Sequence, residues 1–173
     1  MELTIDINGE KQVIQVLESM RGRIENMLPA MKQIGSLVKN EALGNFKAQS
    51  APDGTPWKPL SMATRIARAM RLSGGKGIKN KNGSTKKASQ RVISSAQALL
   101  DTGILRASIQ IQSADKSSVT VSSRLKYSAV HQFGGKAGRG GRVTIPQRQY
   151  MGVNESMSVD ILDIIKNHIG AAQ

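Results

Sequence analysis

The pattern of apolar and polar side chains changes near residue 9 of the chain. At 3–7 apolar side chains alternate with polar ones, which predicts a short strand. From Glu10 onward they recur every three or four residues, the pattern of an amphipathic helix that buries one face. Pro29 interrupts this helix but is tolerated in the first turn of a second one, whose apolar stripe reaches Phe46. The sequence therefore predicts a strand and two successive helices.

The next stretch, SAPDGTPWKPL at 50–60, contains three prolines and a glycine and is predicted to be irregular. Ser61 can cap a third helix because its hydroxyl can accept a hydrogen bond from the first helical turn. On that helix Arg65, Arg68 and Arg71 lie three residues apart, so we expect them to project on one side.

Residues 73–91 have six basic side chains, four glycines, no acidic residue and a single large apolar side chain, Ile78. Such a segment buries too little apolar surface to offset the entropy lost on ordering. We therefore predict a flexible basic arm here, mobile in the free protein, within a single domain that spans 1–173.

Order is predicted to resume at about Val92, and a helical turn should follow the Asp-Thr-Gly at 101–103. Alternating apolar positions after this turn predict a β-hairpin. Gly134–Arg142 is predicted to be a second flexible basic loop. The remaining elements are two strands of the hairpin at 108–113 and 118–123, a short helix at 127–133, a strand at 143–145 and a helix at 157–169. Together these elements predict an α+β fold, with a small antiparallel sheet, packed amphipathic helices and long irregular loops.

The formal net charge of +13 is concentrated in the middle of the chain. Between Arg65 and Arg142 there are 16 basic and two acidic residues, whereas the rest of the chain has nine basic and ten acidic ones. A segregated positive field of this size is typical of a protein that faces a polyanion or an acidic protein surface. The candidate contacts are Arg65, Arg68, Arg71, Lys76, Lys79, Lys81, Lys86, Lys87, Arg91, Lys136, Arg139 and Arg142.

Composition also limits the class of protein. No apolar run approaches the roughly 20 residues of a membrane span, so no membrane partner is expected. The absence of cysteine excludes disulfides, thiolate metal sites and thiol catalysis. We expect a protein that is made and used inside a cell, or in a particle assembled there.

Two motifs raise the question of catalysis. Asp-Thr-Gly at 101–103 is the core motif of retroviral-type aspartic proteases, but those enzymes place a small residue where this chain has Ile104. The favoured interpretation is that Asp101 or Thr102 caps a helical turn. His131 and His168 are 37 residues apart without converging acidic partners, so no metal site, cofactor or catalytic residue is predicted. His131 is expected to be a partly buried, hydrogen-bonded side chain.

Nucleic-acid binding is the main alternative function. The basic arm could neutralise phosphates, but residues 58–126 contain no aromatic side chain on which bases could stack. Contacts with DNA are therefore expected to involve the phosphate backbone of the DNA and not its base sequence, as in a sequence-nonspecific DNA-binding accessory protein.

Four blocks of the chain, taken in order, resemble the phage virion morphogenesis proteins, a family that includes tail completion proteins of Mu-like and P2-like contractile-tailed phages. The blocks are FKAQSAPDGTPWKPLSMAT (46–64), LLDTGILRASI (99–109), YSAVHQFGG (127–135) and VTIPQRQYMGV (143–153). The chain departs from the family in the last block, where Gln-Arg-Gln-Tyr follows Pro146 in place of Ala-Arg-Pro-Phe. Tyr150 then takes the position of the phenylalanine.

The resemblance implies a structural virion protein of the neck or head-proximal tail end and not an enzyme. Such a protein is assembled in the host cytoplasm, completes the tail and enables head–tail joining. The implied partners are further copies of the chain in a sixfold ring around the DNA channel, adjoining neck and tail terminator or tube proteins, and genome DNA.

Scarce aromatic rings in these blocks are expected to anchor the long loops on the sheet, since each ring can bury roughly 150–250 Å². The expected structural anchors are Phe46, Trp57, Tyr127, His131, Phe133, Pro146 and Tyr150.

Overall fold

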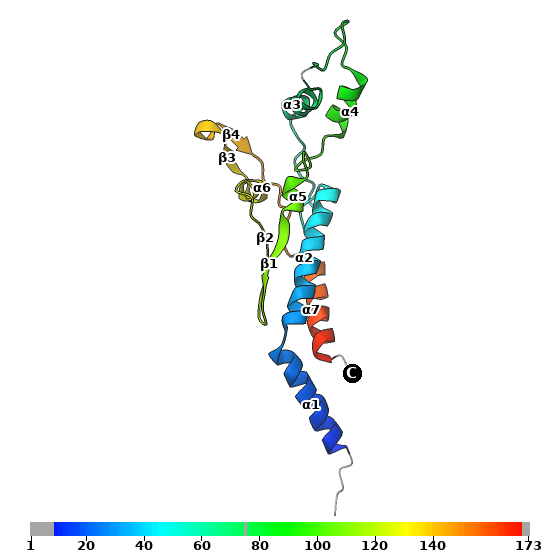
Figure 1. Cartoon of the computed structure of the whole chain (residues 1–173), viewed down its shortest axis with the longest axis vertical. Helices are drawn as coiled ribbons and strands as arrows, with labels where there is room; N and C mark the ends of the chain where they lie inside the picture. Colours follow the sequence, from blue (N-terminus) through cyan, green and yellow to red (C-terminus); the bar gives the residue numbers. More distant parts are fainter. Residues whose placement is uncertain (1–8, 75, 171–173) are drawn as a thin grey trace, which may run out of the picture.

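The structure is a computed structural model that describes residues 9–74 and 76–170. Over these residues the chain forms seven α-helices, one short 3-10 helix and two separate two-stranded antiparallel sheets (Figure 1). The predicted α+β class is confirmed, with two small sheets in place of one. The strand predicted at 3–7 lies outside the described residues.

The middle of the elongated molecule is built on the long helix α2 (Leu28–Ala48). α7 (Glu155–Gly170) runs antiparallel along one side of α2, and the hairpin of β1 (Ile109–Ala114) and β2 (Val119–Ser123) lies along another (Figure 1). The hairpin approaches α2 closely at Gly35, where an added Cβ would lie 2.7 Å from a methyl carbon of Val119. Any larger side chain at Gly35 would therefore push the hairpin away from α2.

The turn between β1 and β2 is organised by Asp115. Its carboxylate accepts hydrogen bonds from the backbone N–H groups of Ser117 and Ser118, each at 2.7 Å, and from both serine hydroxyls. These bonds, led by the one from the Ser117 backbone, hold the pKa of Asp115 at about 2. The hairpin expected from the alternating pattern is confirmed, with Ile109 facing Ser123 in its register.

The main core lies where α2 meets the irregular segments before residue 62 and before α7. Phe46 is fully buried, its ring centroid 5.6 Å from that of Trp57 and 5.2 Å from that of Tyr150. The other buried members of this cluster are Ala42, Ala98, Leu105 and Ile109. Edge-on and tilted ring contacts of this kind add to the stabilisation from burial alone.

α3 (Met62–Leu72) and α4 (Lys87–Ser95) form the upper end of the molecule (Figure 1). As predicted, Ser61 caps α3, accepting a hydrogen bond from the backbone N–H of Thr64 at 3.2 Å. The prediction that 73–91 lacks regular structure is wrong, because α4 begins within it and Ile78 is buried against α3 and α4. The mobility of this segment in the free protein remains a prediction.

The expectation of a loop at Gly134–Arg142 is also wrong. α6 (Ser128–Phe133) leads into β3 (Gly135–Ala137), which pairs with β4 (Val143–Ile145) across a 3-10 turn, η1 (Arg139–Gly141). Gly134 allows this change of direction with φ of 74°, and an added Cβ there would lie 3.0 Å from the backbone nitrogen of Gln147. This glycine-rich segment therefore forms part of a two-stranded antiparallel ribbon, the β3–β4 ribbon, and not an irregular loop.

α1 (Glu10–Glu25) projects from the lower end of the molecule (Figure 1). The sequence predicts a helix here, which is confirmed, but it also predicts one buried face, which is wrong. None of the 16 residues of α1 is buried by the described part of the chain.

Candidate functional site

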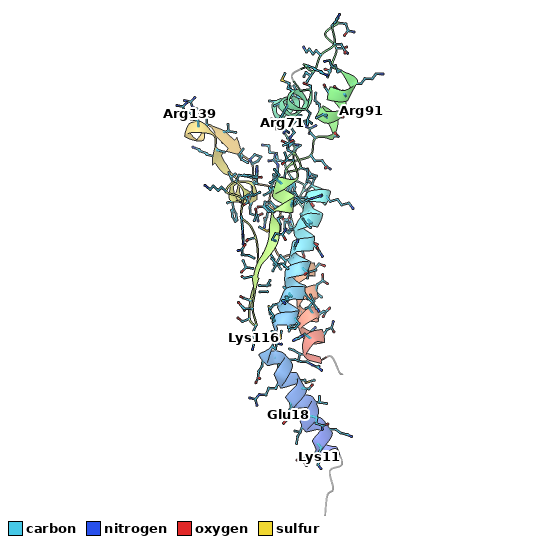
Figure 2. All side chains as sticks on the ribbon, viewed as in Figure 1. Lys11, Glu18, Arg71, Arg91, Lys116 and Arg139 are labelled. Carbon is cyan, nitrogen blue, oxygen red and sulfur yellow. The ribbon has the colours of Figure 1, made fainter. Side chains whose placement is uncertain are left out.

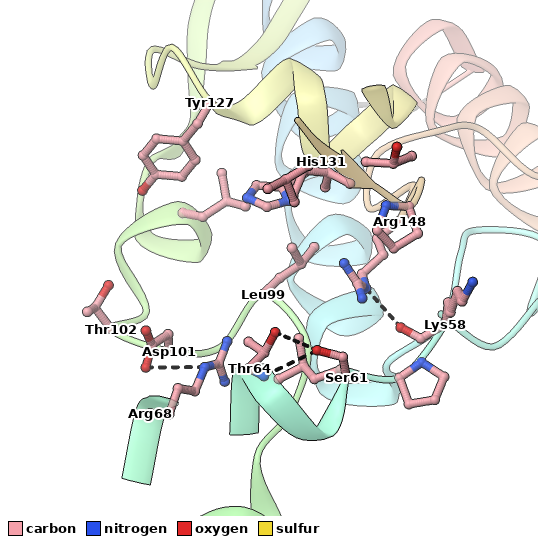
Figure 3. Close-up of a pocket in the computed structure, with 17 residues that line it drawn as sticks. Lys58, Ser61, Thr64, Arg68, Leu99, Asp101, Thr102, Tyr127, His131 and Arg148 are labelled. Atoms are coloured by element: carbon pink, nitrogen blue, oxygen red, sulfur yellow. Dashed lines mark hydrogen bonds and ion pairs between the residues drawn. The ribbon is translucent and has the colours of Figure 1, made fainter. Parts of the chain in front are cut away.

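A cavity of about 580 Å³ lies between the start of α3, the segment before β1, α6 and β4 (Figure 3). Its walls combine aliphatic side chains with two arginines and one histidine. The lining residues include Lys58, Leu60, Arg68, Leu99, Asp101, Tyr127, His131, Val143 and Arg148.

Arg148 is the most deeply buried charged side chain of the site, with an exposed fraction of 6%. Its Nε donates a hydrogen bond to the backbone oxygen of Lys58 at 2.9 Å, and its backbone N–H donates to the oxygen of His131 at 2.8 Å. Burial, and then the positive charge of Arg68, lower the pKa of Arg148 below its usual value. Arg148 therefore ties the segment before α3 to the segment after β4.

His131 is half-buried, and its ring meets that of Tyr127 edge-on with centroids 5.9 Å apart. Its buried Nδ1 has no hydrogen-bond partner among the described residues, so the expected hydrogen-bonding role of the ring is not seen. Burial, and then the charge of Arg148, lower the pKa of His131 below 6.5, which favours the neutral imidazole.

Asp101 faces the arginines of α3. Its Oδ1 lies 3.5 Å from Arg68 Nε and 2.5 Å from Arg71 Nη2. Of the two predicted caps, Asp101 does not bond to α5 (Ile104–Ala107), whose N-cap residue is Gly103. The Thr102 hydroxyl does accept a hydrogen bond from the backbone N–H of Ile104, at 3.4 Å. Asp101 pairs with two arginines, whereas a protease aspartate of this type must share a proton with a second aspartate.

The arginines of α3 bind their own chain. Arg65 Nε donates to the backbone oxygen of Leu60 at 3.2 Å, and Arg68 Nη1 donates to that of Gln97 at 2.8 Å. Arg68 and Arg71 lie on the same side of α3, as predicted, because both reach Asp101. A contact of the three arginines with a polyanion stays a prediction. Arg68 and Arg71 hold α3 against the segment that leads to α5.

Lys86 is also used internally. Its Nζ donates to the backbone oxygens of Lys76 and Gly77 at 2.7 and 2.9 Å. The other predicted contact residues are exposed and lie on two separate projections, α4 with the segment before it and the β3–β4 ribbon (Figure 2). Figure 2 shows Arg91 at the upper end of the molecule and Arg139 at the tip of the ribbon.

The predicted ring anchors divide into two groups. Phe46, Trp57 and Tyr150 lie in the core, whereas the exposed fractions of Tyr127 and Phe133 are 43% and 72%. Phe133 is therefore not an anchor in this chain.

Pro146, another predicted anchor, is half-buried next to the cavity.

Sequence reasoning missed Gln132, which replaces Phe133 as the inward side chain of α6. Its Oε1 accepts hydrogen bonds from the backbone N–H groups of Tyr150 and Met151 at 3.0 and 3.1 Å, and its Nε2 donates to the oxygen of Met151 at 2.6 Å. The sequence carries no local signal for this role, because the partners lie 18 and 19 residues away.

No group of three His, Asp or Glu side chains in the described part of the chain is placed to hold a metal ion. Within the same residues no helix is long and apolar enough to cross a membrane. The cavity pairs aliphatic walls with arginines whose donors are partly satisfied, a mixture typical of surfaces that contact another protein.

Comparison with known proteins gives a match to the phage virion morphogenesis family over residues 9–170. The chain is also 26% identical over 166 residues to the Mu-like prophage FluMu G protein 2 of Haemophilus influenzae, covering 96% of this chain and 95% of that protein. No solved structure matches the chain.

Proposed function

The chain belongs to the phage virion morphogenesis family, and from this premise we propose that it is a structural, non-enzymatic protein of the neck or head-proximal tail end. In this role it completes the tail and makes it competent to join the filled head. The observation that carries the proposal is the family match over 162 residues, from 9 to 170, together with the full-length similarity to a Mu-like prophage protein.

The shape and surface of the molecule support a role in assembly. Two elements project from the main core, α1 at one end and the β3–β4 ribbon near the other (Figure 1). Large apolar side chains remain exposed on both, including Leu17 at 59% and Val143 at 53%. Projecting apolar elements of this kind are typical of chains that complete their packing against other subunits.

We further propose that copies of the chain form a closed ring, sixfold on the tail axis, with genome DNA in its channel. Closed cyclic symmetry suits a protein placed on a tubular tail. Its partners in the particle would be the adjoining neck and tail terminator or tube proteins.

Deletion of the gene tests the role directly. We expect cells without the protein to accumulate filled heads and unattached tails, and expression from a plasmid to restore particles. Electron microscopy counts joined and unjoined structures, and mass spectrometry of purified tails detects the protein. Normal joining without the protein, or its absence from purified tails and virions, would overturn the proposal.

A sequence-nonspecific DNA-binding accessory protein is the second candidate function. It is favoured by one observation: residues 62–95 contain nine Lys and Arg and no Asp or Glu. Such a protein would bind duplex DNA as an isolated monomer, with strong salt dependence, and would not associate with tails. Sedimentation of the free protein with labelled duplexes, beside fractionated tails, separates the two functions.

A further inference from the structure

α1 carries an apolar stripe that the described part of its own chain leaves open. Val13, Leu17 and Ile24 lie on one side of the helix, and their exposed fractions are 58%, 59% and 55%. Val16 and Met20 extend the same stripe. A contiguous exposed apolar face of this kind marks a surface that binds another protein.

The position of α1 is fixed at its C-terminal end. Arg23 Nη1 donates a hydrogen bond to the backbone oxygen of Ile169 at 3.0 Å. His168 Nε2 lies 3.2 Å from the oxygen of Arg23 and 3.1 Å from that of Asn26. A helix held in this way loses less conformational entropy when a partner covers its stripe.

The opposite end of the molecule has a two-helix unit whose packing is incomplete. Its buried apolar cluster comprises Ala69, Ile78 and Ile93. Beside this cluster, α3 and α4 enclose an apolar hollow of about 210 Å³. We call it the α3–α4 groove, and its walls include Ala69, Leu72, Lys76, Ala88 and Val92. Leu72 stands at its edge with 64% of its surface exposed.

We propose that the apolar stripe of α1 in one copy packs into the α3–α4 groove of a second copy. This contact rests on the proposed function, since it supplies the joint between neighbouring copies in the ring. α1 cannot reach the groove of its own chain, because α2 separates them with 21 residues, a length of about 32 Å (Figure 1). A third helix in the groove would complete the packing of α3 and α4.

Charge favours a contact between opposite ends of two copies. Residues 62–95 carry nine basic and no acidic side chains, whereas α7, at the end where α1 is attached, carries three acidic residues and one lysine. α1 itself carries three acidic and three basic residues and is neutral overall, so the negative charge at this end comes from α7. The groove that would receive α1 has two basic side chains in its lining, Lys76 and Lys86.

This contact joins two different surfaces of the chain. Each copy would offer α1 to one neighbour and its groove to the other, so the contact repeats head to tail. A repeated contact of this kind produces a ring when its rotation closes.

The chain has no cysteine, so introduced cysteines report single contacts. We expect differently tagged Leu17→Cys and Leu72→Cys chains, produced together in cells that assemble particles, to form a mixed disulfide dimer on mild oxidation. The control combines Leu17→Cys with Val153→Cys, because Val153 is 60% exposed and does not line the groove. Its mixed dimer should be at least about tenfold less abundant, since cysteines with distant Cα atoms cannot be bridged.

A second variant tests the contact without a cross-link. Leu17→Asp places a charge in the proposed apolar contact. The single chain should tolerate this change, because the side chain at position 17 is 59% exposed. We expect it to weaken self-association at least about tenfold with an unchanged circular dichroism spectrum.

Homodimers of Leu17→Cys chains without the mixed product would indicate packing of α1 on α1 and would overturn the proposal. Equal yields of the two mixed dimers would do the same. The content of purified tails from the same cells tests the proposed function separately. If tails contain the protein but the 17–72 disulfide does not form, the contact is excluded and the proposed function stands. If the disulfide forms but the protein is absent from tails, the contact stands and the proposed function is excluded.

Discussion

At the scale of single residues, an amide decides which side chain of α6 faces the core. Gln132 is 8% exposed and satisfies two backbone N–H groups and one backbone oxygen of residues 150–151. Consecutive residues of a helix point about 100° apart, so the inward position of Gln132 turns Phe133 outward. An unpaired buried N–H group would cost about 1–3 kcal/mol, so the amide has a physical advantage over an apolar side chain here.

This arrangement predicts very different costs for the loss of two aromatic rings. Trp57 is 7% exposed, and its indole nitrogen donates to the oxygen of Gln149 at 2.9 Å. Trp57→Ala should lower the free energy of unfolding by about 3–5 kcal/mol. Phe133→Ala should lower it by less than about 0.5 kcal/mol, since most of the ring is already exposed to water. Urea unfolding measures both, and similar losses in the two variants would contradict the structure.

His131 predicts a pH dependence of stability. Burial and Arg148 lower the pKa of the folded imidazole below 6.5, so the unfolded chain binds a proton at a higher pH than the folded one. The contribution of His131 is therefore present above pH 6.5 and is lost as the pH falls through the folded pKa. His131→Gln should remove this part of the slope between about pH 7 and pH 5, where carboxylates stay ionised. Urea midpoints that change equally with pH in both proteins would exclude it.

At the scale of elements, local patterns predict those parts of the fold whose signals are local. A period of three to four residues predicts α1, α2 and α7, and alternation predicts the β1–β2 hairpin. Ser61 caps α3 through the backbone of its own first turn, and such a contact can be read from the sequence.

Elements that depend on distant contacts were not predictable in this way. α4 follows a turn held by the bonds of Lys86 to residues 76 and 77, and its packing needs Ile78 against α3. The exposed stripe of α1 has the same pattern as a buried one, because periodicity identifies a helix face but not what covers it. The candidate site could not be predicted for the same reason. Nothing near Arg148 in the sequence indicates its hydrogen bond to Lys58, 90 residues away.

Ile78 should therefore control the order of the whole α3–α4 unit. Ile78→Ala removes one of three buried side chains in its cluster and should destabilise this unit by about 2–3 kcal/mol. Hydrogen exchange should accelerate in α4 while amides of α2 and α7 keep their protection. Lys81→Ala, in the exposed turn, is the control. If α4 amides already exchange freely in the unaltered protein, the flexible arm predicted from composition describes this segment better.

At the scale of the whole molecule, the positive charge has two uses. Arg65, Arg68, Arg71 and Lys86 hold the upper end together through bonds to their own chain. Exposed cations on the turn at 79–87 face outward, together with those at the tip of the β3–β4 ribbon (Figure 2). A test of binding to a polyanion should therefore replace the outward-facing cations and keep those that bond to their own chain.

Lys79, Lys81 and Lys87 form a suitable set, because all three are exposed and none lines the α3–α4 groove. If they contact genome DNA, replacing them with glutamine should weaken duplex binding for every sequence. The slope of log affinity against log salt should then fall by about 0.9 for each lost phosphate contact. Folding should be unchanged, since Lys86 and its bonds to residues 76 and 77 remain.

The same variant distinguishes DNA from an acidic protein rim as the partner. Loss of DNA contacts should leave tails that assemble and join heads but retain the genome end poorly, which nuclease sensitivity of joined particles measures. Loss of a protein contact should instead leave duplex binding unchanged and produce complete tails that fail to join heads. The field of +9 over residues 62–95 acts over about one Debye length, roughly 8 Å in physiological salt, so either partner must approach this turn closely. Normal joining, genome retention and duplex binding in the variant would show that these lysines contact only solvent.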